Sequence, residues 1–245
     1  MVPRACFRII FSMRAITDTA FQAIPGETRS QIVNHINPAH LDSRGGFEQI
    51  LPFGEKYDLT YSTKWVKQIN HSWSVPMVFR GFHAQKGKKC QGKLVENAGL
   101  KEMMYDVVID ARPESNTCGS FKVYPLLPID SPNHNLLFVP RGFLHGMMSS
   151  PTEGTVSHLQ YYVDAPYSKK DEITVSPRGL LDYIAKNVME TSTEAMWSLL
   201  KPFVDAVAKG GLELSEKDIV GVPIDKFLEQ EKRNYTKKGK SWWRK

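Results

Sequence analysis

The sequence is poor in cysteine and has no long apolar run. Its three cysteines, Cys6, Cys90 and Cys118, form an odd and sparse set without a CxxC spacing. Such a set argues against a disulfide framework and favours a reducing compartment. No apolar run approaches the roughly 18 residues of a membrane span, and Arg8 interrupts the apolar N-terminus, which makes it a poor signal peptide. We therefore expect a cytoplasmic protein with no membrane partner.

Several motifs that carry chemistry are also missing. The sequence contains no glycine-rich phosphate loop and no G-x-S-x-G nucleophile elbow. Proteins that bind a metal ion inside a barrel of β-strands usually offer two histidines one residue apart, but the second position after His83 is Gln85. His83 and His145 without a nearby carboxylate are a thin set of ligands for zinc or iron. We therefore predict no functional metal, and a metal-dependent enzyme is kept only as a minor alternative.

The positive charge of the chain is concentrated at its C-terminus. The net charge is +6, and residues 231–245 hold seven lysines and arginines against one glutamate, so this tail equals the whole excess. A basic tail with Trp242 and Trp243 can touch nucleic acid or another polyanion. The competing interpretation is a solvated, partly disordered end. We favour the second interpretation and expect no nucleic-acid partner.

Short apolar segments dominate the middle of the chain, and glycine, proline, asparagine and aspartate separate them. This pattern has no alternation of strands with helices and predicts an antiparallel sandwich or barrel of the jelly-roll kind. Residues 72–76 are expected to form a loop. Besides the stretch from residue 79 to 95, the segments that we expect to be strands are 64–71, 103–110, 121–127, 136–139, 143–148 and 156–164.

The pattern changes after Pro177. Apolar residues recur at helical spacing in 180–190 and 194–208, Thr193 is a plausible N-terminal signal for the second helix, and Gly210 fits a helix stop. The chain is large enough to bury a full core within one domain. We therefore divide it into an N-terminal extension (1–30), a β-domain (31–176), a helical appendage (177–230) and the basic tail (231–245).

The stretch from residue 79 to 95, FRGFHAQKGKKCQGKLV, contains a candidate site. It reads as a hairpin of two strands joined by the turn at 86–89. In that hairpin Arg80, His83 and Lys93 can converge. A base next to two fixed cations suits chemistry on an anionic or carbonyl substrate. The alternative is a structural histidine beside a solvated basic turn.

Several blocks of the sequence, in order, resemble the dTDP-4-dehydrorhamnose 3,5-epimerase family. They are FRGFHAQ, QGKLV, YDVVIDARPESNTCG, FVPRGFLHG and LSEKD, preceded by VKQINHS and, more weakly, LDSRGGFEQ. The resemblance covers about residues 40–166 and resumes at 214–218. It implies a cupin, which is a jelly-roll barrel of antiparallel strands, here with the helical appendage added. It also implies a homodimer that needs neither a metal nor an organic cofactor.

The resemblance further implies the chemistry. The substrate would be a nucleoside-diphosphate 4-keto-6-deoxy sugar, whose protons at C3 and C5 are acidified by the C4 ketone. His83 would be the base, and Asp218 its partner, which orients the imidazole. Lys93 would stabilise the enolate oxygen at C4. The positions that match the substrate-binding residues of the family are Arg44, Gln68, Asn70, Arg80, His145 and Lys217.

Three assignments have open alternatives. Asp110 matches a buried carboxylate that could orient a histidine, but it could instead form an ion pair with Arg112 that has no catalytic part. Likewise, His145 could be structural. Lys217 with Asp218 could be an ordinary charge cluster at a helix start.

The general acid is the main departure from the family pattern. In the family a tyrosine acts as the general acid. When residues are counted without gaps from His145, the position of this tyrosine falls on His158. Along a strand His158 and Tyr162 share one face, whereas Tyr161 points the other way. Either His158 is the acid, or Tyr162 reaches the site, or the acid is missing. If the acid is missing, the protein would be a non-catalytic binder of nucleotide sugars. If the acid is altered, the protein would be a single epimerase or a ketoisomerase.

Overall fold

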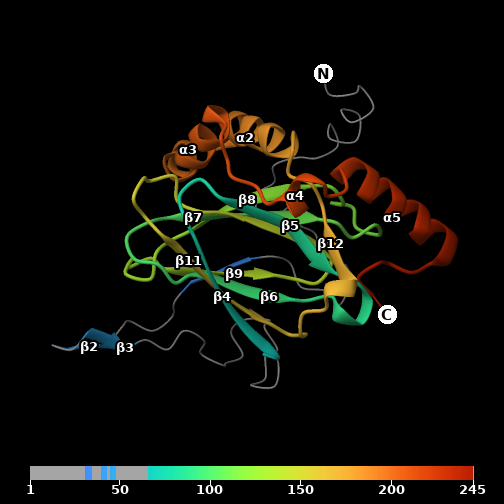
Figure 1. Cartoon of the computed structure of the whole chain (residues 1–245), viewed down its shortest axis with the longest axis horizontal. Coiled ribbons are helices and arrows are strands. Elements are labelled where there is room, and N and C mark those ends of the chain that lie inside the picture. Colours follow the sequence, from blue (N-terminus) through green and yellow to red (C-terminus); the bar gives the residue numbers. More distant parts are fainter. Residues whose placement is uncertain (1–30, 35–39, 43–44, 48–65, 245) are drawn as a thin grey trace.

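The computed structural model describes residues 31–34, 40–42, 45–47 and 66–244. The predicted N-terminal extension and Arg44 lie outside these residues. Two antiparallel five-stranded sheets face each other, and the C-terminal helices lie beside them (Figure 1). This confirms the predicted antiparallel jelly roll with a helical appendage. No helix in the described part of the chain is long and apolar enough to cross a bilayer.

Most strands that follow one another along the chain belong to different sheets. We call the first sheet the β4 sheet; its order is β1 (Gln31–Asn34), β9 (Asn135–Val139), β6 (Lys93–Asn97), β11 (Ser157–Val163) and β4 (Gln68–Ser74). The second, the β5 sheet, has the order β12 (Glu172–Thr174), β5 (Phe79–Gln85), β10 (Phe143–Met148), β7 (Met104–Asp110) and β8 (Phe121–Leu126). A small separate pair consists of β2 (His40–Asp42) and β3 (Gly45–Phe47).

The helices follow the sheets in sequence. Their bounds are Leu180–Thr191 (α2), Glu194–Lys209 (α3), Glu216–Ile219 (α4) and Ile224–Lys238 (α5). The first two agree with the predicted helices to within a residue. Thr193 caps α3 by accepting a hydrogen bond from the backbone N–H of Met196, and Gly210, with φ of 69°, follows its last residue. A positive φ of this kind favours glycine, and this is why a glycine follows the helix.

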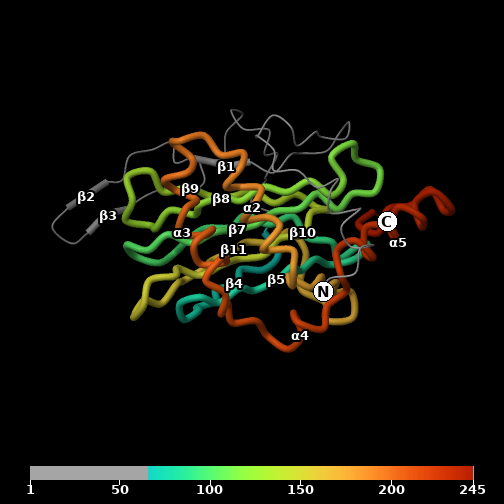
Figure 2. Tube along the Cα trace, turned by 90° about the horizontal axis from the view of Figure 1, so that it is seen from above, coloured from blue at the N-terminus to red at the C-terminus, as the bar shows by residue number. Residues whose placement is uncertain are grey.

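Two apolar layers result from the alternation of side chains along the strands. Phe82, Val107 and Leu144 point out of the β5 sheet and pack against α2 and α3, which lie over this sheet (Figure 2). Val108 and Met147 point the other way, into a second core between the two sheets. All seven residues of β7 are buried for this reason. Polar residues on the inner faces therefore come to lie between the sheets.

The predicted hairpin between β5 and β6 is wrong. β5 pairs with β10 and β12, whereas β6 pairs with β9 and β11 in the other sheet. The connection holds a short 3-10 turn at Gly87–Lys89 and forms a corner between the sheets. Local turn residues do not reveal which strands pair, and this is why the sequence suggested a hairpin. The predicted loop at 72–76 is also shorter, because β4 runs to Ser74.

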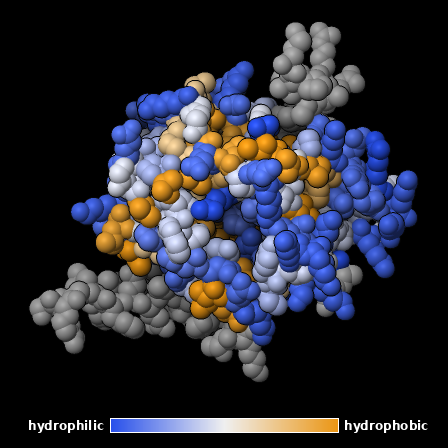
Figure 3. All heavy atoms as spheres, in the orientation of Figure 1, coloured by the Kyte–Doolittle hydropathy of each residue, from blue (hydrophilic) through white to orange (hydrophobic). Residues whose placement is uncertain are grey.

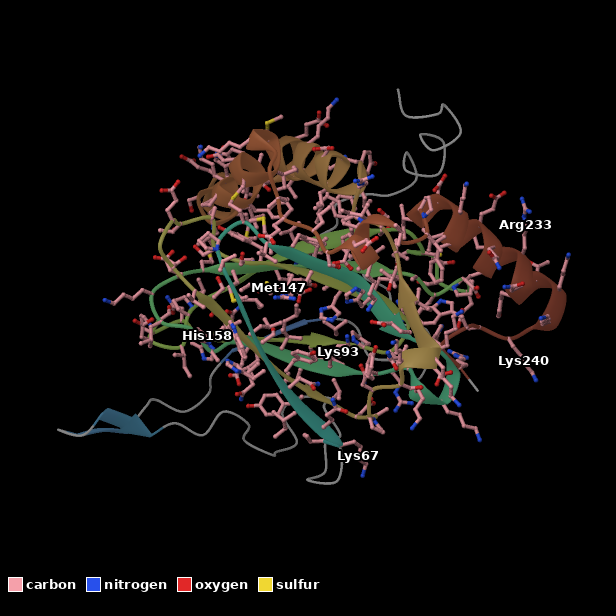
Figure 4. All side chains as sticks on the ribbon, in the orientation of Figure 1. Lys67, Lys93, Met147, His158, Arg233 and Lys240 are labelled. Atoms are coloured by element: carbon pink, nitrogen blue, oxygen red, sulfur yellow. The ribbon has the colours of Figure 1, made fainter. Side chains whose placement is uncertain are left out.

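The expectation of a solvated, partly disordered tail is wrong for residues 231–244. Helix α5 continues to Lys238, and Trp242 and Trp243 are only 9% and 4% exposed. The indole N–H of Trp242 donates to the carbonyl of Ala111 at 2.8 Å. Arg233 and Lys240 point outward (Figure 4). The charges of the tail thus face solvent, while its two tryptophans bury a large apolar area.

We expect Trp242→Ala to lower the free energy of unfolding by about 3–5 kcal/mol, because it removes a large buried ring and a hydrogen bond. Lys238→Ala, at an exposed position, is the matched control and should change it by no more than about 0.5 kcal/mol. Chemical denaturation of the two variants measures both values. Equal denaturation midpoints for the two variants would contradict the tail's part in the core.

Candidate active site

A bulge in β5 turns two predicted site residues toward the same space. His83 lies opposite His145 and Arg80 lies opposite Met147, so β5 has one residue more than β10 in this stretch. Gly81 occupies the bulge, where a Cβ atom would come within 2.6 Å of the Cα of Gly146. Residues three apart on a regular strand face opposite ways. The bulge therefore puts both Arg80 and His83 on the same face of the β5 sheet.

His83 and Asp218 form a pair at this place. The Nε2 atom of His83 lies 2.7 Å from a carboxylate oxygen of Asp218, which comes from α4 far along the chain. Burial acts to raise the pKa of Asp218, but hydrogen bonds from His83 and Ser215 outweigh it and lower that pKa. The ionised carboxylate holds the imidazole with Nε2 protonated. This leaves Nδ1 as the basic nitrogen.

Lys93 faces this pair from the other sheet and is bound to a second histidine. Its Nζ atom lies 2.8 Å from Nε2 of His145, whose Nδ1 lies 3.0 Å from the carboxylate of Asp106. Burial lowers the pKa of Lys93 to about 8, while Asp106 acts to raise it. Burial, followed by the charge of Lys93, lowers the pKa of His145. His145 is therefore neutral, and its two ring nitrogens link the ammonium of Lys93 to the carboxylate of Asp106.

Asp106, which was not among the predicted site residues, takes the place expected for Asp110. The carboxylate of Asp110 instead binds Arg112 at 2.8 Å and accepts hydrogen bonds from Ser115 and Thr117. The structure thus shows the ion pair with Arg112 that was the alternative for Asp110. Asp106 and Asp110 both belong to the segment YDVVID and lie on one face of β7. They differ in that Asp106 lies beside His145.

A cavity of about 220 Å³ joins these groups. Figure 3 shows a hollow between the sheets with hydrophilic residues around it. The residues that line the cavity are Gln68, Asn70, His83, Ala84, Gln85, Gln91, Lys93, Tyr161, Tyr167 and Glu172. A second cavity of about 430 Å³ beside α3 is larger but holds none of the predicted site residues. The chemistry of the lining therefore places the site in the smaller cavity.

The predicted amides lie at the cavity but are partly engaged with protein groups. The side-chain oxygen of Gln68 accepts from the backbone N–H of Tyr167 at 3.0 Å, and its NH₂ group donates to Asn70 at 2.7 Å. Gln85 and Gln91 likewise bind the backbone of Ser168 and Ala165. Three glutamines thus hold the 165–168 segment at the rim.

The structure does not bring His158 or Tyr162 into the cavity. His158 points away from the cavity and stacks on His71, with ring centroids 5.3 Å apart, and Tyr162 donates to Glu96 at 2.9 Å. Tyr161 lines the cavity instead, and Nζ of Lys93 lies 5.9 Å from the centre of its ring. Figure 4 labels Lys93 between the sheets and His158 away from it. The predicted alternation was right, but the face assigned to the interior was wrong.

The two remaining cations have protein partners. Arg80 donates to the hydroxyl of Ser74 at 2.9 Å and to the carbonyl of Trp73 at 3.2 Å. Lys217 binds the carboxylate of Glu172 at 2.5 Å. Within the described residues, no group of three or more histidines, cysteines and acids is arranged to hold a metal ion.

Comparison with known sequences identifies the family. The family model described as dTDP-4-dehydrorhamnose 3,5-epimerase matches residues 31–201, which is most of the chain. The chain belongs to this family. It is 40% identical over 82 residues to the enzyme of that name from Salmonella typhimurium and 38% identical over 124 residues to that from Escherichia coli. These matches cover 34% and 49% of this chain, but only 42% and 64% of the two relatives.

Solved structures of the family have the same fold. The epimerase from Elizabethkingia anophelis is 26% identical, has a TM-score of 0.56 and is matched over 82% of this chain and 94% of its own. The epimerase from Bacillus anthracis, solved with TDP and PPi bound, is also 26% identical, with a TM-score of 0.53 over 79% of this chain and 93% of its own.

We expect Lys93 to titrate near pH 8 rather than near its ordinary value of 10.5. In Asp106→Asn the pKa of Lys93 should fall further, because the carboxylate that acts to raise it is gone. NMR titration of the ¹³Cε atoms of labelled lysines, assigned with a Lys93→Met variant, measures both values. Titration of Lys93 above pH 10 would contradict the buried environment.

Proposed function

We propose that this chain is an isomerase that epimerises a dTDP-4-keto-6-deoxyhexose at C3, at C5 or at both. The observation that carries the proposal is the meeting of a carboxylate-bound imidazole, a buried ammonium and a phenol at one cavity. Membership of the epimerase family supports the reaction type. The relative from Bacillus anthracis, solved with TDP and PPi bound, supports a nucleotide as part of the ligand.

His83 is the proposed base. Asp218 keeps its Nε2 protonated, so Nδ1 can accept a proton from the carbon next to the ketone. Asp218 then stabilises the imidazolium that forms, as in the triad of serine proteases. Lys93 meets the negative charge that develops on the C4 oxygen. A pKa of about 8 keeps its ammonium mostly protonated at neutral pH.

Tyr161 is the proposed acid. Burial raises the pKa of its phenol, so the hydroxyl keeps its proton until the enolate takes it. His83 comes from the β5 sheet and Tyr161 from the β4 sheet, so the two groups approach a sugar in the cavity from opposite sides. Removal of a proton from one side and its return from the other inverts the carbon. The idea of a silent binder rested on a missing acid, and Tyr161 weakens it.

Two finer proposals concern the setting of the enzyme. We propose a homodimer that covers the outer face of β4, where Ile69 and Trp73 are 60% and 65% exposed. A molecular mass of one chain in solution would contradict it. We also propose a cytoplasmic location, which the free cysteines Cys90 and Cys118 support.

We expect Tyr161→Phe to lower kcat by about 10²–10⁴-fold, the usual contribution of a general acid. His158→Phe and Tyr162→Phe are the matched controls and should stay within about twofold of the wild type, because both side chains lie outside the cavity. NMR of the conversion of dTDP-4-keto-6-deoxyglucose measures each rate. Loss of activity in His158→Phe with activity retained in Tyr161→Phe would reverse the assignment.

A further inference from the structure

Glu172 places a carboxylate in the wall of the cavity. It begins β12, lies opposite Gln85 of β5, and lines the same cavity as His83 and Lys93. Each of its oxygens has a partner: Nζ of Lys217 lies 2.5 Å from Oε1, and the hydroxyl of Tyr167 donates to Oε2 at 2.9 Å. The side chain is only 12% exposed. No residue of the resemblance pointed to this carboxylate.

The environment keeps Glu172 ionised. Burial acts to raise its pKa, but the hydrogen bonds from Lys217 and Tyr167 outweigh burial and lower the pKa. A fixed negative charge in this wall repels an anionic ligand. Lys217 is different, because its side chain is 48% exposed and carries a mobile charge on a flexible stem. In the pair of Glu172 and Lys217, the lysine is therefore the side chain that can turn toward a ligand.

We propose that Glu172 is the resting partner of Lys217, and that the diphosphate of the nucleotide replaces it when the ligand binds. This inference rests on the proposed function, since it needs a ligand with a diphosphate. Glu172 then sets the affinity of the site in two ways. It repels the phosphates, and it holds the cation that they require.

When Lys217 exchanges Glu172 for the diphosphate, the pair of His83 and Asp218 stays in place. Lys217 precedes Asp218 in α4, but Asp218 has its own bonds to His83 and Ser215. The segment after α4 is fixed by a backbone bridge between Val175 and Val222. Lys217 can therefore change its partner without moving Asp218. In the absence of ligand, the pair with Glu172 adds one more link between α4 and β12.

The sign of the effect on affinity separates this proposal from a purely structural role. We expect Glu172→Gln to bind dTDP about threefold to tenfold more tightly, and Lys217→Gln to bind it more weakly by a similar factor. Lys217→Gln should weaken the binding of dTDP by a larger factor in the Glu172→Gln background, because no carboxylate competes for the lysine there. Calorimetry with dTDP on the full chain, for the wild type, both single variants and the double variant, gives these four affinities.

Glu216→Gln is the matched control. It removes the same charge from an exposed position of α4, one residue from Lys217 and outside the cavity lining, so the affinity for dTDP should stay within about twofold. The gain in Glu172→Gln should shrink in 1 M salt, because mobile ions screen charges at the mouth of a cavity. Thermal unfolding checks that each variant is folded.

Weaker or unchanged binding of dTDP by folded Glu172→Gln would overturn the inference and leave Glu172 as an anchor of α4. If that variant does not fold, the wild type still decides. The side-chain NMR signal of Lys217, assigned by its loss in Lys217→Gln, should shift at saturating dTDP, and an unchanged signal overturns the exchange. Failure of the wild type to bind dTDP contradicts the proposed function and the inference together, whereas binding with the wrong sign contradicts the inference alone.

Discussion

The hydrogen bond between the buried ammonium of Lys93 and His145 is the interaction on which the rest of the site depends. An unpaired ammonium inside a protein is costly, and here a neutral imidazole and the carboxylate of Asp106 stabilise it. The chain Asp106–His145–Lys93 runs from β7 through β10 to β6 and so joins the two sheets. It holds a positive charge at the cavity, where we propose that an enolate oxygen forms.

The jelly roll brings the other groups of the site to this cation. Because β5 and β11 belong to different sheets, the proposed base His83 comes from one sheet and the phenol of Tyr161, the proposed acid, from the other. The C-terminal part then completes the site from outside the barrel: α4 supplies Asp218, and Trp242 binds the corner at Gly87 between the strands of His83 and Lys93. Residues that are distant in sequence thus hold one small cavity, and the carboxylate of Glu172 adds a charge that we propose to govern the entry of phosphate.

Much of this could be predicted from the sequence, and the failures share a cause. Most strands of the two sheets and the helices α2 and α3 followed from apolar patterns, whereas β12, α4 and α5 were not predicted. The pairing of His83 with Asp218 followed from the resemblance of RGFH and LSEKD to the family. Tyr161 was missed because alternation shows which residues share a face, but not which face is interior. Asp106 was missed because it shares a face of β7 with Asp110, and the sequence does not show which of the two lies beside His145. Both choices depend on contacts with other strands. Similarly, the charges of the tail hid Trp242 and Trp243, whose burial depends on contacts far away in the chain.

Exchange of substrate protons with heavy water decides whether His83 and Lys93 act on the carbons next to the ketone as proposed. The protein would be incubated with dTDP-4-keto-6-deoxyglucose in D₂O, and deuterium at C3 and C5 counted by mass spectrometry and NMR. We predict exchange at one or both carbons in the wild type, and loss of this exchange in His83→Ala and in Lys93→Met. Binding of the nucleotide sugar without exchange at either carbon, or exchange that persists without His83, would contradict this prediction.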